Sequence, residues 1–575
     1  MRSTFFGLEI GRKSLLAQQR ALDVVGHNVA NANTPGFSRQ EAVMVTSYPD
    51  NVPSINQPSA HGLVGTGVMV AEIARVRNGF FDQRYREQNI DLGKWQQRQS
   101  ELERIELLFN EATETGLSSV FDNFWQAWQE LAKTPESLTV RAIVRERGNA
   151  LAETMNLIYS QFKDARITLN QTLEIKMREI NSYAEQIAQL NGQIQAMELA
   201  GGKANDLRDR RDYLLDQLSK VINIRVSQGT LSEIRVSIGN YDLVDGQTVN
   251  HLRLSDTRTE RGVMLNDLEW ETTGDPVEIL GGEVAAILEV RDVEIPYYID
   301  KLDELAEAVI ANTNAYHTEG YGLADNGPVA IKGGSGVSWS AVTIDAGNTR
   351  WGEWKVEMTS STDFKVLFLK DDGSWEEVGT GQLGTEFNSG GAAFTLTGTA
   401  AAGDAWTFTT VAGDAAAGTP PRLGAPLFFN PINKNSLMQV ISLNAAILGE
   451  EGLQRIAASL EEGKRGNGDN ALRLAQLKHS FLLSGGEATI NDFIRSLTGK
   501  LAVDAQEAKR NAENQNLLVE QIDNLRQEVS SVSLDEEMTS MVRFQHAYNA
   551  AARLVTAVDE MIEMIVNRMG LVGRG

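Results

Sequence analysis

The chain has 575 residues, enough for roughly three or four domains, and its 42% hydrophobic and 23% charged residues are typical of folded protein. Its formal net charge of −24 disfavours nucleic acid phosphates and anionic membrane surfaces, so we expect neither partner. The absence of cysteine excludes disulfides and cysteine-ligated metals, and the six histidines show no ligand spacing, so no metal site and no cofactor are expected.

The N-terminus lacks the pattern of a cleavable secretory signal. Such a signal needs an apolar run of roughly 7–15 residues, and Glu9, Arg12 and Lys13 interrupt any such run here. No stretch approaches the roughly 18–20 apolar residues of a membrane-spanning helix. We therefore expect neither a cleaved leader nor a membrane anchor.

The first predicted element is a helix with one packing stripe, because apolar residues recur every seven positions and on the adjoining row. The stripe consists of Leu8, Leu15, Leu22, Val25 and Val29. The helix is expected to stop near Asn31, because Pro35 disfavours helix in the residue before it and Gly36 permits a turn. Residues 37–77 are rich in Gly, Pro, Ser and Asn and are expected to be extended.

Helical spacing dominates from about residue 78 to 221. An a/d heptad pattern is clearest within this region, and Gly201-Gly202 breaks it. The pattern consists of Leu173, Ile180, Tyr183, Ile187, Leu190, Ile194 and Met197. A second helix is predicted from Asn205 to about Lys220.

The spacing of the apolar residues then changes from helical to alternating and back to helical. Alternation from Ile222 to Ile238, around a turn at Gln228-Gly229, predicts antiparallel strands, and helix is expected again over 283–317. Residues 321–430 are rich in Gly, Ala, Thr and Ser with spaced aromatics, and a hairpin is predicted at Asp371-Asp372-Gly373. We interpret this last stretch as a separate all-β domain inserted into a helical body.

After residue 435 the chain is expected to be helical to its end. One apolar stripe in this region steps by four and three residues through Leu518, Ile522, Leu525, Val529 and Val532. The last stripe runs through Leu534, Met538, Met541, Gln545, Tyr548, Ala552, Val555, Asp559, Ile562, Val566 and Met569. Its polar members, Gln545 and Asp559, should weaken but orient the packing.

Both terminal stripes need a partner, and the simplest arrangement packs the first helix on the last. The predicted fold class is multidomain α+β, with terminal helices paired as a coiled coil, an elongated α-helical bundle body and inserted antiparallel β domains. The expected domains are a stem of 1–60 with 534–575, a helical body of 61–221 with 275–320 and 431–533, a small β unit of 222–274, and an outward β domain of 321–430.

The segment Ala21–Phe37 resembles the N-terminal signature of the axial proteins of the bacterial flagellum, a family of rod, hook and junction proteins. The match is carried by Asn28, Asn31, Thr34, Pro35 and Gly36. Ser38-Arg39-Gln40 after it resembles the version found in the hook-associated protein 1 family. Near the other end, Ser533–Met538 and Arg543–Ala551 are similar to that family's terminal helix.

Further matches run in order between the two ends, and the resemblance is weakest over 321–430. They are Asn205–Asp212, Gly281-Gly282, Arg291-Asp292, Asn314, His317 and Gly320. The resemblance implies a structural subunit, not an enzyme, in a hollow helical assembly at the hook–filament junction. It also implies paired terminal helices lining the inner tube, with β domains outside.

The resemblance implies an extracellular flagellar location, reached through the flagellar type III export channel without a cleavable signal. The implied partners are other copies in a ring or short helical segment, hook protein below, a second junction protein or filament subunits above, and a cytoplasmic export chaperone on the C-terminal helix. The implied N-terminal interface is Leu8, Leu15, Leu22, Val25, Asn28, Val29, Asn31, Pro35 and Gly36. The implied C-terminal assembly and chaperone interface is Leu534, Met538, Met541, Gln545, Tyr548, Ala552, Val555, Ile562 and Met569.

Several local patterns have a plainer explanation than chemistry. The alternating charges of Asp206–Asp212 favour a helix face with ion pairs at i,i+3 and i,i+4 over a catalytic carboxylate cluster. Gly62–Gly67 lacks the Lys-Ser/Thr of a phosphate-binding loop and is interpreted as a linker. His27, His317 and His546 are isolated, which favours structural or surface roles.

Other functions remain open at this point. A hook or distal rod subunit is the nearest alternative, although the long helical region 78–221 disfavours it. A secreted cell-wall hydrolase would need paired carboxylates in a cleft, and no sequence feature indicates them. A glycan-binding module would use exposed tryptophans to stack on sugars, but those of 321–430 are expected to be core residues: Trp351, Trp354, Trp375 and Trp406.

Overall fold

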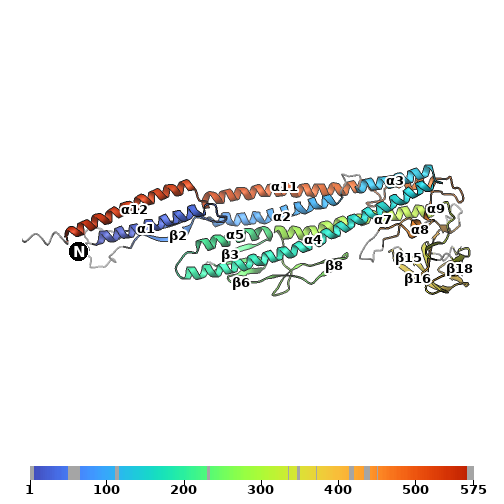
Figure 1. Cartoon of the computed structure of the whole chain (residues 1–575), viewed down its shortest axis with the longest axis horizontal. Helices are drawn as coiled ribbons and strands as arrows, with labels where there is room; N and C mark the ends of the chain where they lie inside the picture. Colours follow the sequence, from blue (N-terminus) through green and yellow to red (C-terminus); the bar gives the residue numbers. More distant parts are fainter. Residues whose placement is uncertain are drawn as a thin grey trace, which may run out of the picture.

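The computed structural model describes residues 5–48, 65–109, 116–229, 233–333, 336–345, 350–370, 372–412, 420–432, 441–449 and 451–565. Long helices run along an elongated molecule, and two groups of strands lie on one side of them (Figure 1). The predicted α+β class is therefore confirmed.

The stem at one end of the molecule pairs α1 (Phe6–Asn31) with α12 (Leu534–Glu563) (Figure 1). α1 ends at the predicted residue. The Ser533 hydroxyl caps α12 by accepting a hydrogen bond from Glu536 N, and three acidic residues in the first turn favour the positive end of the helix dipole. β1 (Gln40–Thr46) and β2 (Val68–Arg75) form an antiparallel pair against α1, as expected for an extended segment.

The body contains the longest helices. α4 has 62 residues and spans about 93 Å. Its predicted heptad positions face the core as far as Ile194, whereas the last one, Met197, is 48% exposed. α2 lies between α11 and α5 and packs against both. The bounds are α2 Gly79–Phe109, α3 Leu117–Lys133, α4 Leu138–Leu199, α5 Asn205–Val221 and α11 Ile490–Ser530.

The helix predicted over 283–317 is interrupted. α6 (Gly282–Glu289) and α7 (Ile295–Glu319) are joined by a π-helical turn, Val290–Glu294. The wider turn places the guanidinium of Arg291 in the core, where it donates hydrogen bonds to Asn266 O at 2.6 Å and to Asp267 Oδ1 at 2.7 Å. Helical spacing in the sequence does not distinguish this turn from a regular one.

The small β unit is a sheet of order β3-β4-β5-β6 with two further antiparallel pairs, β7–β10 and β8–β9. Its buried residues, including Val236, Leu243 and Trp270, join the core of the surrounding helices instead of forming their own. The bounds are β3 Arg225–Gln228, β4 Ile234–Ile238, β5 Tyr241–Asp245, β6 Thr248–Val249, β7 Leu252–Leu254, β8 Arg258–Glu260, β9 Val263–Leu265 and β10 Leu268–Trp270.

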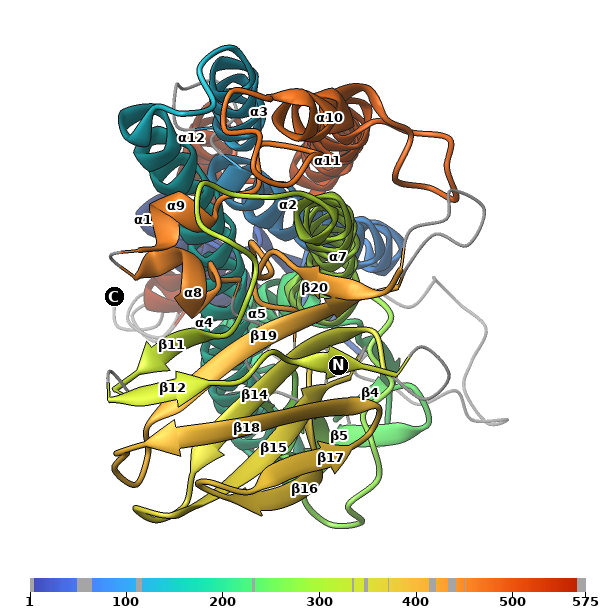
Figure 2. The same ribbon diagram turned by 90° about the vertical axis from the view of Figure 1, so that its right-hand side faces the viewer.

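The second group of strands forms two sheets around one separate core that contains Trp354, Phe364 and Phe408. One sheet has the order β11-β19-β14-β15-β16 with β20 beside β19, and the other has β12-β18-β13 with β17 beside β18. Figure 2 shows these sheets beneath the helices α7, α10 and α11. The bounds are β11 Val329–Lys332, β12 Val337–Trp339, β13 Thr343–Ile344, β14 Gly352–Met358, β15 Asp363–Leu369, β16 Trp375–Gln382, β17 Glu386–Ser389, β18 Ala392–Gly398, β19 Ala405–Val411 and β20 Arg422–Gly424.

The expectation of continuous helix after residue 435 is wrong. The described residues between 441 and 489 contain only α8 (Ala445–Leu448), α9 (Gly452–Arg455), α10 (Asp469–Gln476) and the 3-10 turn Leu477–His479. Repeated glycines oppose a long helix here. One of them, Gly468, lies so close to α3 that an added Cβ would come within 2.1 Å of Ala132 O.

Candidate assembly site

The two helices of the stem meet through small residues. An added Cβ would lie 3.1 Å from Val558 Cγ2 at Gly7 and 2.6 Å from Val555 Cγ2 at Gly11. Ala551 is buried on the same face of α12, and Ala551 O lies 3.7 Å from the Gly11 position. We call these five residues the seam. It lets the two backbones approach closely, and Val555 is its only member that the heptad pattern included.

The predicted stripes share Val555 with the seam and otherwise lie mainly beside it, on the flanks of the two helices. In α1 the leucines of the stripe are half-buried, Val25 and Asn28 are buried, and Val29 is exposed. In α12, Met541, Ala552, Val555 and Ile562 are half-buried, and Gln545 is exposed. Met569 and Val566 lie outside the described residues.

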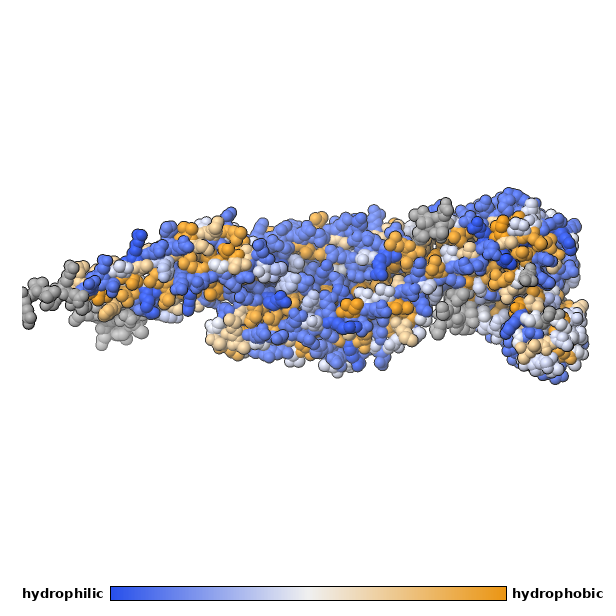
Figure 3. Space-filling view, viewed as in Figure 1, coloured by the Kyte–Doolittle hydropathy of each residue, from blue (hydrophilic) through white to orange (hydrophobic). Residues whose placement is uncertain are grey.

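Closure of the seam therefore leaves apolar side chains on the surface. Leu534 is 52% exposed and Met538 is 59% exposed, and Val29 and Tyr548 are each 36% exposed. We call these four residues the stem rim. Apolar surface is visible along the stem in Figure 3, interspersed with charged side chains. The stem is thus a closed helix pair with uncovered apolar flanks.

A polar cluster ties the base of the stem together. The Asn28 side chain donates to Gln40 O at 2.9 Å and to Glu537 Oε2 at 3.1 Å, and its Oδ1 accepts from Gln40 N at 3.0 Å. Arg39 Nε donates to Glu537 Oε1 at 2.8 Å, and Arg39 Nη1 donates to Glu536 Oε2 at 3.0 Å. Glu537, only 2% exposed, thus holds α12 in one register on α1.

The turn after α1 fits against α5. Ser38 N donates to Asp209 Oδ2 at 2.9 Å. Gly36 has a φ of +81°, and an added Cβ would lie 2.9 Å from Tyr213 Cβ, so glycine is required there. The Asn31 side chain donates to His27 O at 3.0 Å, whereas Pro35 is exposed. Asn31 and Gly36 thus shape the turn, whereas Asn28 belongs to the polar cluster and Pro35 remains on the surface.

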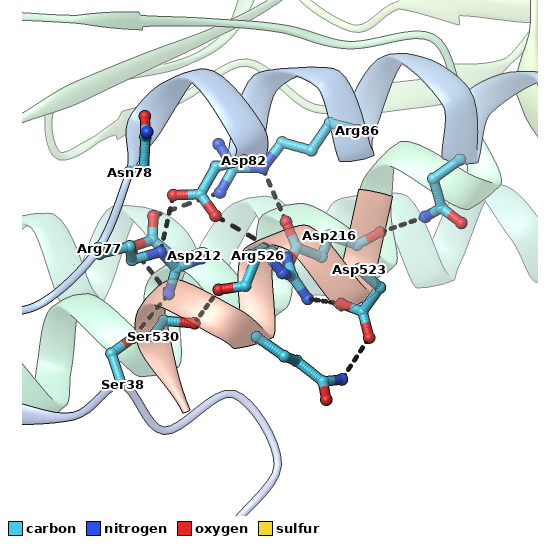
Figure 4. Close-up of polar contacts among 12 residues, drawn as sticks. Ser38, Arg77, Asn78, Asp82, Arg86, Asp212, Asp216, Asp523, Arg526 and Ser530 are labelled. Carbon is cyan, nitrogen blue, oxygen red and sulfur yellow. Dashed lines mark hydrogen bonds and ion pairs between the residues drawn. The ribbon is translucent and has the colours of Figure 1, made fainter. Parts of the chain in front are cut away.

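Beside this turn lies a group of paired charges that we call the joint network: Arg75, Arg77, Asp82, Arg86, Asp209, Asp212, Asp216 and Arg526. Figure 4 labels the members of this network other than Arg75 and Asp209. Arg77 Nε donates to Asp82 Oδ2 at 2.7 Å, and Arg526 Nη1 donates to Asp216 Oδ2 at 2.6 Å. Burial opposes ionisation of Asp212, but nearby arginines outweigh it and hold the pKa of this carboxyl below its ordinary value. The network joins β2, α2, α5 and α11.

The charges of Asp206–Asp212 form ion pairs, but Asp209, Asp212 and Arg208 pair with other elements instead of at the expected i,i+3 and i,i+4 positions. Asp209 and Asp212 pair with Arg75 of β2, each at 2.8 Å, and both are largely buried. The four arginine partners were not identified from the sequence. The alternation Arg75-Val76-Arg77 could have indicated two of them, because residues two apart in an extended segment lie on the same face.

A second polar cluster anchors the β domain. Asn314 of α7 donates to Phe429 O at 2.8 Å and accepts from Phe428 N at 2.9 Å. His317 Nε2 accepts from Ala457 N at 2.9 Å, and Nδ1 lies 2.8 Å from Pro426 O, which fits the neutral ring. Burial lowers the pKa of His317 to about 4, so this histidine is structural.

The tryptophans of the β domain divide into two pairs. Trp354 and Trp406 are buried, as expected for core residues, whereas Trp351 and Trp375 are each 40% exposed.

Across the described ranges there is no group of three His, Cys, Asp or Glu side chains arranged to hold a metal ion. None of the described helices is both long and apolar enough to cross a lipid bilayer.

Comparison with known proteins gives consistent matches along the chain. Residues 102–330 match the flagellar hook-associated protein FlgK helical domain, residues 8–37 the flagella basal body rod protein family, and residues 526–569 the flagellar basal body rod FlgEFG protein C-terminal family. Flagellar hook-associated protein 1 of Bacillus subtilis (strain 168) is 32% identical over 581 residues, which cover 100% of each chain. The protein of the same name from Salmonella typhimurium is 25% identical over 575 residues, covering 96% of this chain and 98% of its own. The solved structure of the flagellar hook junction protein FlgK from Burkholderia pseudomallei has a TM-score of 0.49 at 18% identity, over 78% of this chain and 100% of that one.

Proposed function

The chain belongs to the flagellar hook-associated protein 1 family, and from this premise we propose that it is an axial structural subunit joining the flagellar hook to the filament. α1 and α12 supply the contacts that hold neighbouring copies together. The observation that carries this proposal is the stem itself, a closed helix pair whose apolar rim has no cover within the described chain.

The driving force follows from this exposure. Full burial of a leucine or methionine side chain stabilises by roughly 1.5–3 kcal/mol, and a half-exposed one gains proportionately less. The stem rim supplies such side chains in the first half of α12 and near the end of α1, so stacked copies gain burial where these side chains meet a neighbour. Glu537 and its partners at the base fix the register in which the rim is presented.

We further propose the neighbours of the assembled subunit. Hook protein lies below, and a second junction protein or filament subunits lie above. Before export, a cytoplasmic chaperone covers the α12 part of the rim, because apolar side chains exposed in the cell promote aggregation. Export through the flagellar channel requires no cleavable signal.

The test is electron microscopy of a strain that lacks this gene, together with an immunoblot of the medium for flagellin. We expect hooks without filaments and flagellin lost to the medium. Absence of hooks would instead assign the protein to the rod or hook. Normal filaments would refute an axial role and make a cell-wall hydrolase or a glycan-binding module the next hypotheses to test.

A further inference from the structure

Two tryptophans of the β domain remain on its surface. Trp351, directly before β14, and Trp375, the first residue of β16, are each 40% exposed. Tryptophan is normally well buried, as is Trp354, whose Nε1–H donates to Thr410 Oγ1 at 3.0 Å. By contrast, the indole N–H groups of Trp351 and Trp375 donate no hydrogen bond to any residue that the structure describes. Each of the two therefore presents apolar surface and a free donor to the outside.

Trp375 faces away from the core of the β domain. Its direct cross-strand partner is Leu369 of β15. The preceding residue of that strand, Phe368, packs against the core, with its ring centre 5.1 Å from that of Trp354. Because successive side chains of a strand point to opposite faces, Leu369 and its partner Trp375 lie on the outer face of the sheet.

Trp351 lies on the same outer face. Its two neighbours in the chain both lie on the side of Phe368. An added Cβ at Gly352 would be 3.2 Å from Phe368 Cζ, and the guanidinium carbon of Arg350 lies 5.6 Å from the centre of that ring. Trp351, between these two residues, therefore points to the opposite face, as Trp375 does.

The spacing of the two indoles suits a small, extended ligand. β14, β15 and β16 are consecutive neighbours in the sheet, so the two tryptophans lie two strands apart. Leu369, the partner of Trp375, lies beside Glu353 when the β14–β15 register is continued by one residue. Trp351 precedes Glu353 by two residues, so strand dimensions place the Cα atoms of the two tryptophans about 12 Å apart.

The exposed apolar area is too small for a protein partner. At 40% exposure, each tryptophan offers about 100 Å², and the two together offer about 200 Å². A stable protein interface buries about 800 Å² on each partner. This face therefore fits a ligand that touches little more than the two rings, which is the size of a short oligosaccharide.

Glu377 adds a hydrogen-bond acceptor beside Trp375. It lies two residues further along β16, pairs with Leu367 and so shares the outer face. Its side chain is exposed and forms no ion pair with a described residue, whereas the neighbouring Glu376 is paired with Arg350 at 2.8 Å. A carboxylate accepts hydrogen bonds from hydroxyl groups but repels other anions, as does the whole chain with its net charge of −24. These charges favour a neutral ligand that carries hydroxyl groups.

We propose that Trp351, Trp375 and Glu377 form a binding site for a neutral oligosaccharide. Each indole stacks on the apolar face of one sugar ring, and the carboxylate of Glu377 accepts hydrogen bonds from sugar hydroxyls. The indole N–H groups supply donors at the edges of the same site. The β domain lies at the far end of the molecule from the stem (Figure 1), so this site is independent of the stem contacts.

Glycan binding by the full-length chain tests this proposal. The purified chain is applied to an array of neutral oligosaccharides of glucose, galactose, mannose and N-acetylglucosamine, together with their sialylated forms. We expect binding to a neutral oligosaccharide and weaker binding to its sialylated form. Absence of binding to every neutral oligosaccharide would overturn the proposal, and so would a preference for the sialylated forms.

Titration calorimetry with the bound oligosaccharide then locates the site. Trp351→Ala and Trp375→Ala should each weaken binding about tenfold, because each removes one stacking contact. Phe481→Ala is the matched control, since this aromatic side chain is 63% exposed outside the β domain, and it should leave the affinity unchanged. Unchanged affinity in both tryptophan variants would place the ligand elsewhere and overturn the site.

Glu377→Lys supplies a test that keeps both indoles in place. It should shift the preference of the chain toward sialylated oligosaccharides, because a cation replaces the carboxylate beside the ligand. Circular dichroism in the near ultraviolet checks that each variant is folded, and this variant keeps the proposal testable should an alanine variant fail to fold. An unchanged preference in Glu377→Lys would overturn the assignment of the carboxylate to the site.

Discussion

Glycine at positions 7 and 11 determines how closely the terminal helices approach. Any side chain at Gly11 has to displace Val555, which already lies 2.6 Å from the Cβ position. Gly26 is in the same helix, and an added Cβ there meets nothing within 4 Å. Gly11 is therefore required by the packing of α12, whereas substitution of Gly26 should change only the helix propensity of α1.

We expect Gly11→Leu to open the stem and Gly26→Ala to leave it closed. Alanine is favoured over glycine in a helix by about 1 kcal/mol, so the second variant should be slightly more stable. Hydrogen exchange of the α12 amides measures both effects, and faster exchange should appear only in Gly11→Leu. Equal exchange in both variants would show that the seam does not control pairing.

Glu537 is the second residue with a definite expected effect. Glu537→Gln removes a buried charge that accepts from Asn28 and Arg39, and leaving those donors poorly paired costs about 1–3 kcal/mol. Glu536→Gln is the matched control, because the exposed pair with Arg39 is worth about 0–1 kcal/mol. The opening free energy of α12, again from hydrogen exchange, should fall in the first variant and barely change in the second.

Glu353 makes stability depend on pH. Burial raises the pKa of this β14 carboxyl to about 7, and the Asn444 side chain donates to both of its oxygens, at 2.9 Å and 3.2 Å. The unfolded chain loses this proton near pH 4.5 while the folded chain keeps it to about 7, so this group lowers stability as pH rises through that window. His317 acts in the opposite direction, since its neutral ring costs stability as pH falls from 6.5 to about 4.

Comparison of Glu353→Gln with the parent isolates the carboxyl, because His317 is common to both. The variant should be more stable than the parent at pH 8, by up to about 3 kcal/mol, and equal to it near pH 4.5. Chemical denaturation at the two pH values measures the difference. A gain that does not vary with pH would mean that Glu353 is not buried in protonated form.

At the scale of elements, α5 is positioned by charge as much as by apolar packing. Its aspartates pair with arginines from β2, α2 and α11, so the joint network links the stem to the body. Figure 4 shows the pairs with α2 and α11. Removing one carboxylate leaves nearly buried arginines uncompensated. Such a loss is far more costly than the loss of a solvated ion pair.

We expect Asp212→Asn to destabilise the body by about 3 kcal/mol, whereas Asp206→Asn on the same helix should cost less than about 1 kcal/mol because Asp206 is exposed. Denaturant unfolding monitored by circular dichroism compares the two variants. Similar losses in both would show that the joint network is energetically no different from surface pairs.

At the scale of the whole molecule, the two groups of strands differ in how they are stabilised. The strands of 329–424 enclose their own aromatic core, while those of 225–270 share a core with α4 and its neighbours. A segment whose buried residues pack against one another can fold alone, whereas a segment whose buried residues pack against other parts of the chain cannot.

A fragment of residues 325–426 should therefore fold by itself and unfold cooperatively on heating, with the near-ultraviolet signal of packed tryptophans. A fragment of residues 222–274 should remain unfolded under the same conditions. Thermal melts of both fragments check the contrast. Cooperative folding of the smaller fragment would contradict the shared core.

The sequence by itself determined the class of fold and most of the elements. The C-terminal end of α1, the region of α2–α5 and the central strands β14, β15 and β19 of the β domain followed from apolar period and from proline and glycine positions, which act locally. The ordered signature residues were enough to identify the axial family. The proposed interface and chaperone roles of the stripe residues stay predictions.

Only the tertiary structure decided which face of each helix meets which neighbour. A heptad pattern shows that an apolar stripe exists, but it does not mark Gly7 and Gly11, whose lack of side chains lets the two helices approach closely at the seam. The arginines of the joint network and the partners of Glu537 are distant in sequence, so no local pattern pairs them. Local propensity acts over a few residues, whereas close approach and charge pairing depend on distances that exist only once the chain has folded.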